Sequence, residues 1–182
     1  MKLEQTGDWK KLQELFTSLP ERFEAAANQA VLQEAQAFRT QVVEGLREQA
    51  PGGQAFKPLS AATLALRKFR GFKGSKALLV RGDLRNSITV FKEGSKVFVG
   101  VLRTAKGQAG QPLVNVAELN EYGSRPIVIR ITPKARAFLH MVFRKAGLDN
   151  PREGRPSTGI AIVRIPARPF IGPVAARYAA DP

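Results

Sequence analysis

Residues 18–49, SLPERFEAAANQAVLQEAQAFRTQVVEGLREQ, carry the longest regular pattern in the chain. Ser18-Leu19-Pro20-Glu21 has the serine, proline and glutamate spacing of a helix N-terminus. Ala50-Pro51-Gly52-Gly53 then stops the helix. The pattern predicts a helix of roughly thirty residues, about 45 Å long, lying across a sheet or a neighbouring subunit. Its apolar residues recur at helical spacing on one stripe, at Phe23, Ala27, Ala30, Val31, Ala35, Phe38, Val42 and Leu46.

A second, shorter helical pattern precedes this one. Trp9, Leu12, Leu15 and Phe16 have the spacing of one helix face. Residues 1–50 are therefore expected to form an N-terminal helical segment of two helices, separated near Ser18. Residues 51–182 are expected to form the body, in one domain with the long helix.

The body alternates short strand and helix patterns. Residues 87–91 and 96–102 predict a β-hairpin closed at Glu93-Gly94, and apolar residues occupy both of its faces. A strand pair that is apolar on both faces needs two covers; we expect the long helix to be one and a second subunit the other. Further strands are predicted at 126–131 and 160–165, and short helices at 60–69, 113–122 and 132–145. A last short helix is predicted after Phe170, ending near Tyr178. The predicted fold is α+β, with the long N-terminal helix packed on a small, mostly antiparallel sheet and short helices at its periphery.

Composition indicates a folded chain. It has 182 residues, 43% hydrophobic and 24% charged, which is typical of a globular protein with a real core. The absence of cysteine excludes disulfides, thiolate metal sites and cysteine nucleophiles. We expect no membrane span and no secretion segment, because no apolar run is long enough and the N-terminus is polar.

Charge is distributed unevenly along the chain. The formal net charge is +14. Residues 1–50 hold 6 Lys and Arg against 8 Asp and Glu, whereas residues 51–182 hold 23 against 7. The basic body therefore predicts a polyanionic partner, either nucleic acid or an acidic protein face.

No catalytic constellation can be assembled from these residues. His140 is the single histidine and is flanked by apolar residues, which is typical of a packed side chain. Glu118 and Glu121 are spaced as neighbours on one helix face, which indicates a solvated face or an interface ion pair. The remaining carboxylates of the body are scattered, and the glycines do not form a phosphate-binding loop. We expect no enzyme activity, no catalytic residue, no metal and no cofactor.

Four short blocks follow one another in the body. They are Phe56-Lys57-Pro58-Leu59-Ser60, then Leu79 to Ile88 (LVRGDLRNSI), Ala117 to Gly123 (AELNEYG), and Ile165-Pro166-Ala167-Arg168-Pro169-Phe170-Ile171. In this order the blocks resemble the virion morphogenesis and tail-completion proteins of tailed phages, over roughly residues 56–175. That family has tryptophan where this chain has Phe56, and acidic and hydroxyl residues where it has Val80-Arg81. Each block is weak evidence alone, and their order and spacing carry the resemblance.

The resemblance implies a structural virion protein at the neck or tail end, acting in tail completion or head-tail joining. It implies a homo-oligomer, a hexameric ring, whose partners are portal, adaptor or tail-tube proteins, assembled in the host cytoplasm. An enzyme carried on the virion is a weaker alternative. Two proline residues stiffen the last block as an arm, and arginine and aromatic residues are enriched at interfaces. The expected subunit or partner contacts are Gly82, Asp83, Leu84, Arg85, Phe91, Phe98, Glu121, Tyr122, Gly123, Arg168, Pro169, Phe170 and Ile171.

Basic loops provide the alternative function, a module that binds DNA without sequence specificity. In a ring, the same loops would contact genomic DNA in the lumen or an acidic neighbouring ring. Gly82 is expected to take a positive φ angle and Asp83 to cap the following turn. The loop at 103–112 is expected to be mobile until a partner binds. The candidate contacts with DNA or an acidic partner are Lys73, Lys76, Arg103, Lys106, Arg152 and Arg155.

Overall fold

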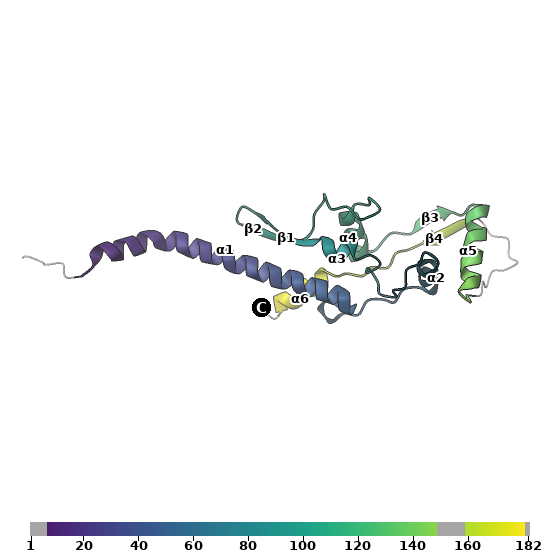
Figure 1. Cartoon of the computed structure of the whole chain (residues 1–182), viewed down its shortest axis with the longest axis horizontal. Helices are drawn as coiled ribbons and strands as arrows, with labels where there is room; N and C mark the ends of the chain where they lie inside the picture. The colour runs from purple at the N-terminus through teal and green to yellow at the C-terminus, as the bar shows by residue number, and fades with distance from the viewer. Residues whose placement is uncertain (1–6, 149–158, 181–182) are drawn as a thin grey trace, which may run out of the picture.

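A computed structural model describes residues 7–148 and 159–180. In chain order, the elements are α1 (Trp9–Glu48), a 3-10 turn η1 (Pro51–Gly53), α2 (Ala61–Phe69), α3 (Asp83–Ser87), β1 (Ile88–Glu93), β2 (Lys96–Val101), α4 (Leu113–Tyr122), β3 (Ile127–Arg130), α5 (Pro133–Lys145), β4 (Ile160–Val163) and α6 (Gly172–Ala180). Figure 1 shows an elongated molecule in which the first half of α1 extends alone beyond the body. The α+β prediction is confirmed, with the sheet divided in two.

The N-terminal segment is one helix, and the predicted division into two helices is wrong. Pro20 lies inside α1, and Ser18 does not cap a helix, because its hydroxyl donates to the Leu15 carbonyl. Thr17 donates in the same way to Gln13. Pro20 has no N–H to donate to the Phe16 carbonyl, and the hydroxyls of Thr17 and Ser18 bond the carbonyls of Gln13 and Leu15 in the preceding turn. The helix bends in this N-terminal part (Figure 1).

The two sheets are separate antiparallel strand pairs, a β1–β2 hairpin and a β3–β4 pair whose strands are joined through α5. β1 pairs with β2, and β3 pairs with β4. The inner face of β1–β2 packs on the second half of α1, and Arg39 of that helix donates to the Ile88 carbonyl at 2.7 Å. The predicted cover of the hairpin by the long helix is confirmed on this face. The outer face presents Phe91 stacked on Phe98, with centroids 6.4 Å apart and both rings close to half exposed.

The core lies where the second half of α1 meets α3, β1, α4 and α6. Its fully buried side chains include Val42 and Leu46 of α1, Ile88 of β1, and Phe170 and Val174 near the C-terminus. The apolar stripe of α1 is therefore buried only in its C-terminal part. A distal unit of α2, α5, β3 and β4 lies at the other end of the molecule (Figure 1). Phe69 of α2 and Phe138 of α5 join its helices, with ring centroids 5.2 Å apart.

Gly52 joins η1 to α6 by backbone contact. Its φ is +59°, and a Cβ added there would lie 2.4 Å from the Pro173 carbonyl oxygen. The neighbouring Gly53 also has a positive φ, +83°, with nothing within 4 Å of such a Cβ. These two glycines differ in the space around them and share a conformation that L-residues rarely adopt.

We expect Gly52→Ala to lower the free energy of unfolding by about 3 kcal/mol, since backbone must move to admit the methyl group. Gly53→Ala is the matched control, with an expected loss of about 1 kcal/mol from the φ angle alone. Urea unfolding of both variants measures the difference. Equal losses would show that η1 is not held against α6.

Candidate functional site

Glu121, at the end of α4, receives the start of α6. Its Oε2 accepts from the backbone N–H groups of Phe170 at 2.8 Å and Ile171 at 3.2 Å, and its Oε1 accepts from Gly172 at 2.7 Å. The first N–H groups of a helix have no partner within the helix, and its N-terminus favours negative charge. The carboxylate therefore caps α6 from another element, and the third and fourth blocks of the sequence are bound to each other.

Arg168 connects this junction to the first block. Its Nε donates to the Lys57 carbonyl at 3.0 Å and its Nη2 to the Pro58 carbonyl at 3.2 Å. Its backbone N–H donates to the Asn120 carbonyl at 2.6 Å, and the residue is 7% exposed. A buried guanidinium held by backbone carbonyls fixes the chain path around it. Glu121 and Arg168 together bond the backbone of residues 57–58, 120 and 170–172. We name this set of contacts the motif junction.

Gly123 allows the fourth block, residues 165–171, to pass close beside α4. Its φ is +79°, and an added Cβ would lie 3.0 Å from the Ala167 nitrogen. Ser124 exchanges two hydrogen bonds with Ile165, its N–H donating to the carbonyl at 3.0 Å and its Oγ accepting from the N–H at 2.8 Å. The glycine of the third block is thus required by the backbone of the fourth.

Phe170 and Arg168 correct one prediction from the sequence. Both are expected at a subunit contact, yet Phe170 is 0% exposed and lies in the core with Leu46 and Val174. A side chain with no exposed surface cannot reach another subunit in this conformation. The proline-stiffened segment at 165–171 places Phe170 in the core of its own chain. Pro169 and Ile171 remain half-buried, and contact of these two with a partner stays a prediction.

Residues 82–85 also act within the chain. Gly82 has the expected positive φ, +82°, and Leu84 is buried in the core. Asp83 is the first residue of α3, not its cap, and its Oδ2 accepts from the Gln108 N–H at 3.1 Å. Arg85 donates to the side chain of Asn86. The Asp83 bond fastens the loop at 103–112, whose predicted mobility stays a prediction.

Three of the predicted contact residues do lie on the surface. Tyr122 is 79% exposed, at the end of α4, and Phe91 and Phe98 form the outer face of the β1–β2 hairpin. They lie on different elements. Their exposure is compatible with the predicted contacts.

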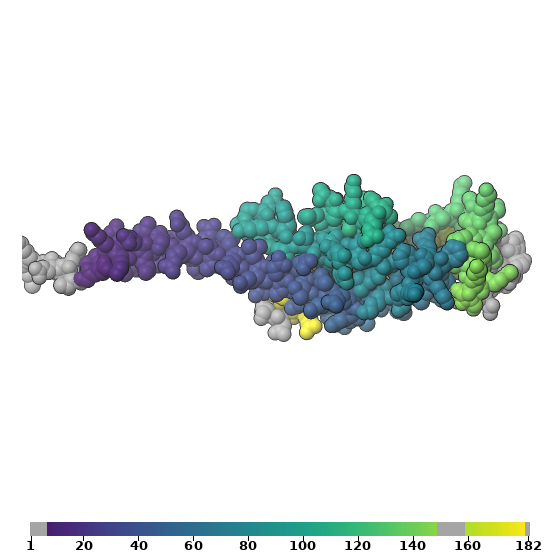
Figure 2. All heavy atoms as spheres, in the orientation of Figure 1, coloured from purple at the N-terminus to yellow at the C-terminus, as the bar shows by residue number. Residues whose placement is uncertain are grey.

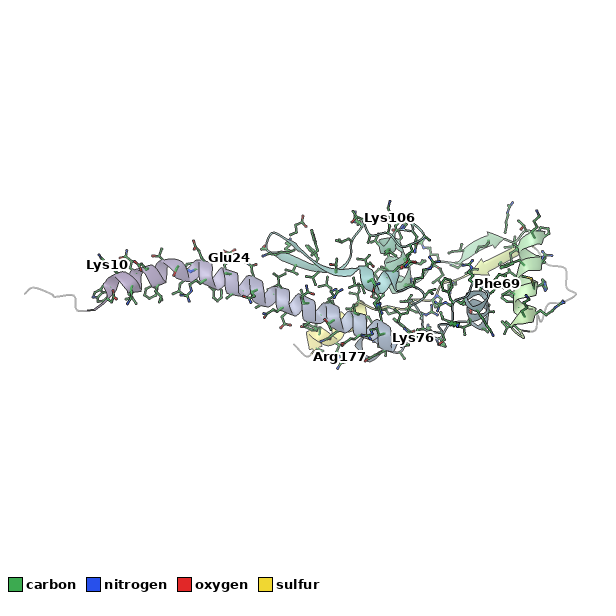
Figure 3. All side chains as sticks on the ribbon, viewed as in Figure 1. Lys10, Glu24, Phe69, Lys76, Lys106 and Arg177 are labelled. Carbon is green, nitrogen blue, oxygen red and sulfur yellow. The ribbon has the colours of Figure 1, made fainter. Side chains whose placement is uncertain are left out.

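The predicted basic contacts are spread over the molecule. Lys76 donates to the Arg47 carbonyl at 2.6 Å, so it closes the C-terminal end of α1. Lys73, Arg103 and Lys106 are exposed, and Figure 3 shows Lys106 and Lys76 well apart. Arg152 and Arg155 lie outside the described residues. The structure therefore brings no single cluster together from this set.

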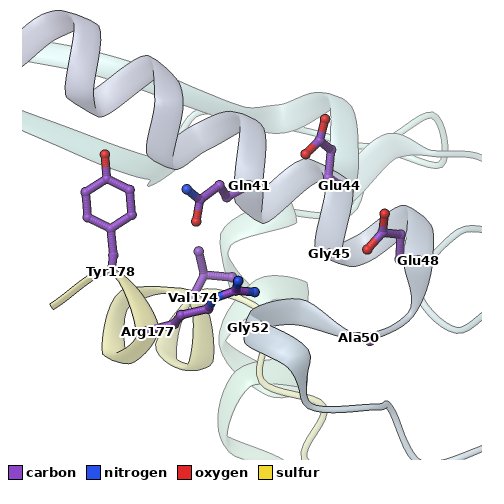
Figure 4. A pocket seen from close by; sticks show the side chains of 9 residues that line it. All are labelled: Gln41, Glu44, Gly45, Glu48, Ala50, Gly52, Val174, Arg177 and Tyr178. Carbon is purple, nitrogen blue, oxygen red and sulfur yellow. The ribbon is translucent and has the colours of Figure 1, made fainter. Parts of the chain in front are cut away.

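A groove runs between the end of α1 and α6 (Figure 4). Glu44 and Glu48 of α1 line it together with Arg177 of α6. At its rim Tyr178 donates to Glu34, and this hydrogen bond, followed by burial and the charge of Glu34, raises the pKa of Tyr178. Figure 4 shows no histidine or serine among its lining side chains. The groove offers polar contacts without an acid-base or nucleophilic pair.

Metal sites and membrane spans were sought in the same residues. Within 7–148 and 159–180, no three histidine, aspartate or glutamate side chains converge as metal ligands do. None of the helices in these ranges is both long and apolar enough to span a membrane. His140, on α5, is half-buried.

Two features were missed by reasoning from the sequence. One is the internal use of Glu121, which sequence spacing cannot reveal because its partners are fifty residues away. The other is a gathering of basic residues on α2 and α5. A signal for it does exist in the sequence, since residues 49–82 and 122–148 contain no aspartate or glutamate.

Comparison with known protein families agrees with the resemblance that the four sequence blocks carry. A family model described as the phage virion morphogenesis family matches residues 7–177, almost the whole chain. The match includes α1 and the motif junction, beyond the range of 56–175 that the blocks cover. Comparisons with curated proteins and with solved structures give no match.

Proposed function

The chain belongs to the phage virion morphogenesis family, and on this premise we propose that it completes the tail or joins tail to head as a closed homo-oligomeric ring. Membership gives it a role in building the virion. The finer role, the neck or tail-end location and the hexameric ring expected from the resemblance are the proposal. A structural component needs a rigid body and surfaces that remain free for neighbours.

The free half of α1 is the observation that supports assembly. Residues 9–27, about 28 Å of helix, precede Asn28, which is the first α1 residue to bond the body, through Lys92. We name residues 9–27 the arm. Its large apolar side chains are exposed, with Phe16 at 63% and Phe23 at 74%. They share one stripe, which comprises Trp9, Leu12, Phe16, Leu19 and Phe23.

An apolar stripe of this length is costly to leave in water. Isolated helices of this size are marginally stable, and their stability in proteins comes from packing of the apolar face. Spacing by three and four residues is also the seam of helix packing. The arm is therefore expected to pack against another subunit.

A second apolar surface lies at the opposite end of the molecule. On one face of the β3–β4 strand pair, Val128 is 64% and Ile162 is 72% exposed. Two different free surfaces at opposite ends suit a heterologous interface, which generates a ring when the rotation closes. This geometry supports a ring over a two-fold dimer.

Substitution of the stripe tests assembly. We expect the wild-type chain to form a ring-sized species, and Phe16→Ser with Phe23→Ser to leave a monomer, because the arm loses its largest apolar groups. Glu14→Ser with Glu21→Ser is the matched control, with the same spacing on the same helix, and should assemble as the wild type does. Light scattering across concentration, with electron microscopy of the assembled species, gives the result. A wild-type monomer at all concentrations, or assembly of the stripe variant, contradicts the proposal.

The place in the virion needs a separate test. In the phage that encodes the chain, deletion of the gene is expected to leave heads and tails that do not join. Purified wild-type protein added to such an extract should restore infectious particles, and the stripe variant should not. Normal joining without the chain contradicts tail completion, whatever the assembly state.

A further inference from the structure

The distal unit is basic without any carboxylate. We define the cationic lobe as residues 55–82, 122–148 and 159–165, which include α2, β3, α5 and β4. They contain seven, six and one Lys or Arg, fourteen in all, and no Asp or Glu. Figures 1 and 2 place this lobe at the end of the molecule opposite the arm. It contains segments far apart in sequence, so the fold gathers the charge.

The lobe contains no carboxylate of its own that could balance its charge. Among the residues at 7–148 and 159–180, the ion pair found is Lys11 with Asp8, which is on the arm. Arg67 of α2 donates to the backbone carbonyl of Lys76 at 2.8 Å. Its pKa is lowered, first by burial and then by the charge of Arg168. Two guanidinium groups thus raise the local positive potential near α2.

A neighbouring copy does not supply the missing negative charge. The arm, residues 9–27, contains three acidic and three basic residues, so it adds no net negative charge to a lobe with fourteen positive ones. Protein interfaces are also depleted of lysine at their centres. A partner with dense and uniform negative charge fits better, and duplex DNA carries one charge per about 1.7 Å of its axis.

The lobe offers phosphate contacts more than base contacts. Phe69 is turned onto Phe138, and Phe72 lies under the Arg81 guanidinium, 5.4 Å from it. Neither ring is a free platform for base stacking. The exposed cations occur along α2 and α5 and not on one helix shaped for a groove, and such contacts carry no sequence information.

We propose that the cationic lobe binds duplex DNA through its phosphodiester backbone, without reading base sequence. The proposal goes beyond the ring and does not depend on it. It also moves the contact from the loop with Arg103 and Lys106 to the distal unit. Lys73 and Lys76 are the predicted contacts that belong to the lobe, and both are exposed.

The test compares two variants of equal charge in the full-length chain. The lobe variant replaces four exposed cations by glutamine, namely Lys68, Arg70, Lys134 and Lys145. The control variant replaces another three lysines and one arginine, all exposed and outside the lobe, namely Lys10, Lys96, Lys106 and Arg22. Binding of a labelled duplex of about 30 base pairs is followed by fluorescence anisotropy between roughly 50 and 300 mM salt. Light scattering of each variant separates lost binding from lost assembly.

We expect the lobe variant to reduce the magnitude of the slope of log K against log salt by about 3.6, because each of the four phosphate contacts contributes about 0.9. Affinity near 100 mM salt should fall about 100-fold for the lobe variant and less than about 5-fold for the control. Duplexes of different sequence should bind equally. If the wild-type chain binds DNA in this way as a monomer, the proposed ring is wrong and the DNA-binding inference stands.

Three outcomes would overturn it. The first is an equal loss in both variants, which would assign binding to net charge alone. The second is the absence of binding by the wild type at low salt. The third is displacement of the duplex by polyglutamate of equal charge at equal concentration, which would assign the lobe to an acidic protein surface.

Discussion

Phe170→Ala is expected to lower the free energy of unfolding by about 4 kcal/mol, the cost of removing a fully buried aromatic ring from a packed core. Phe170 is 0% exposed and contacts the cluster formed by α1, α3, β1, α4 and α6. A loss of that size is a large part of the stability of a domain. The variant should therefore unfold at lower urea concentration, and its assembly should fail only as a result of unfolding.

Phe98→Ala is the matched control for this ring. Phe98 is 48% exposed, on the outer face of the β1–β2 hairpin, and its one aromatic neighbour is Phe91. We expect a loss near 1 kcal/mol from the stacked pair. Phe170→Leu, which keeps much of the volume, should lie between the two.

Folding and assembly are separated by measuring both. From the sequence, the proline-stiffened segment at 165–171 suggests that Phe170 forms a subunit contact. The burial of Phe170 shows that it stabilises the fold of its own chain. If Phe170→Ala keeps the unfolding midpoint of the wild type and loses only its oligomer, the internal role is wrong. Urea unfolding by circular dichroism and light scattering on the same samples decide this.

Local patterns predicted the elements well. Thr132 caps α5 and Ser60 caps α2, and the hairpin predicted from residues 87–91 and 96–102 forms by pairing residues 88–93 with 96–101. These features depend on residues a few positions apart, so the sequence contains their cause. The long helix was predicted to begin at Ser18, because a proline in a capping pattern is typical of a helix start. In the continuous helix, the hydroxyls of Thr17 and Ser18 bond backbone carbonyls of the preceding turn. Local spacing does not discriminate between a helix that begins at Ser18 and a helix that continues through it.

The arrangement of the blocks could not be derived from the sequence. Their order supports the family, and their chemistry suggested surface contacts, because arginine, aromatic and carboxylate side chains are frequent at interfaces. Glu121 and Arg168 instead bond backbone that is between forty-nine and one hundred and eleven residues away. Only the fold brings a carboxylate to the start of α6 and a guanidinium to the carbonyls of Lys57 and Pro58.

Glu121→Ala is the second large effect, with an expected loss of about 3 kcal/mol in the free energy of unfolding. The carboxylate accepts three backbone hydrogen bonds at the start of α6, and bonds to a charged group are each stronger than neutral ones. Removing it leaves the part-buried N–H groups of Phe170 and Ile171 without this acceptor, and the exposed N–H of Gly172 without it as well. Glu121→Gln keeps one carbonyl oxygen and loses the charge at the helix N-terminus, so about half of that loss is expected.

Glu118→Ala is the control, since Glu118 is exposed one turn earlier on α4. Its removal should change the free energy of unfolding by less than about 0.5 kcal/mol. Hydrogen exchange gives the sharper reading, because loss of the cap should first release the amides of α6 and leave those of β1 protected. Equal stability of Glu121→Ala and Glu118→Ala would mean that α6 is held by Val174 and Phe170 alone. The motif junction would then be a consequence of core packing, and the carboxylate would be free to serve a partner as the sequence first suggests.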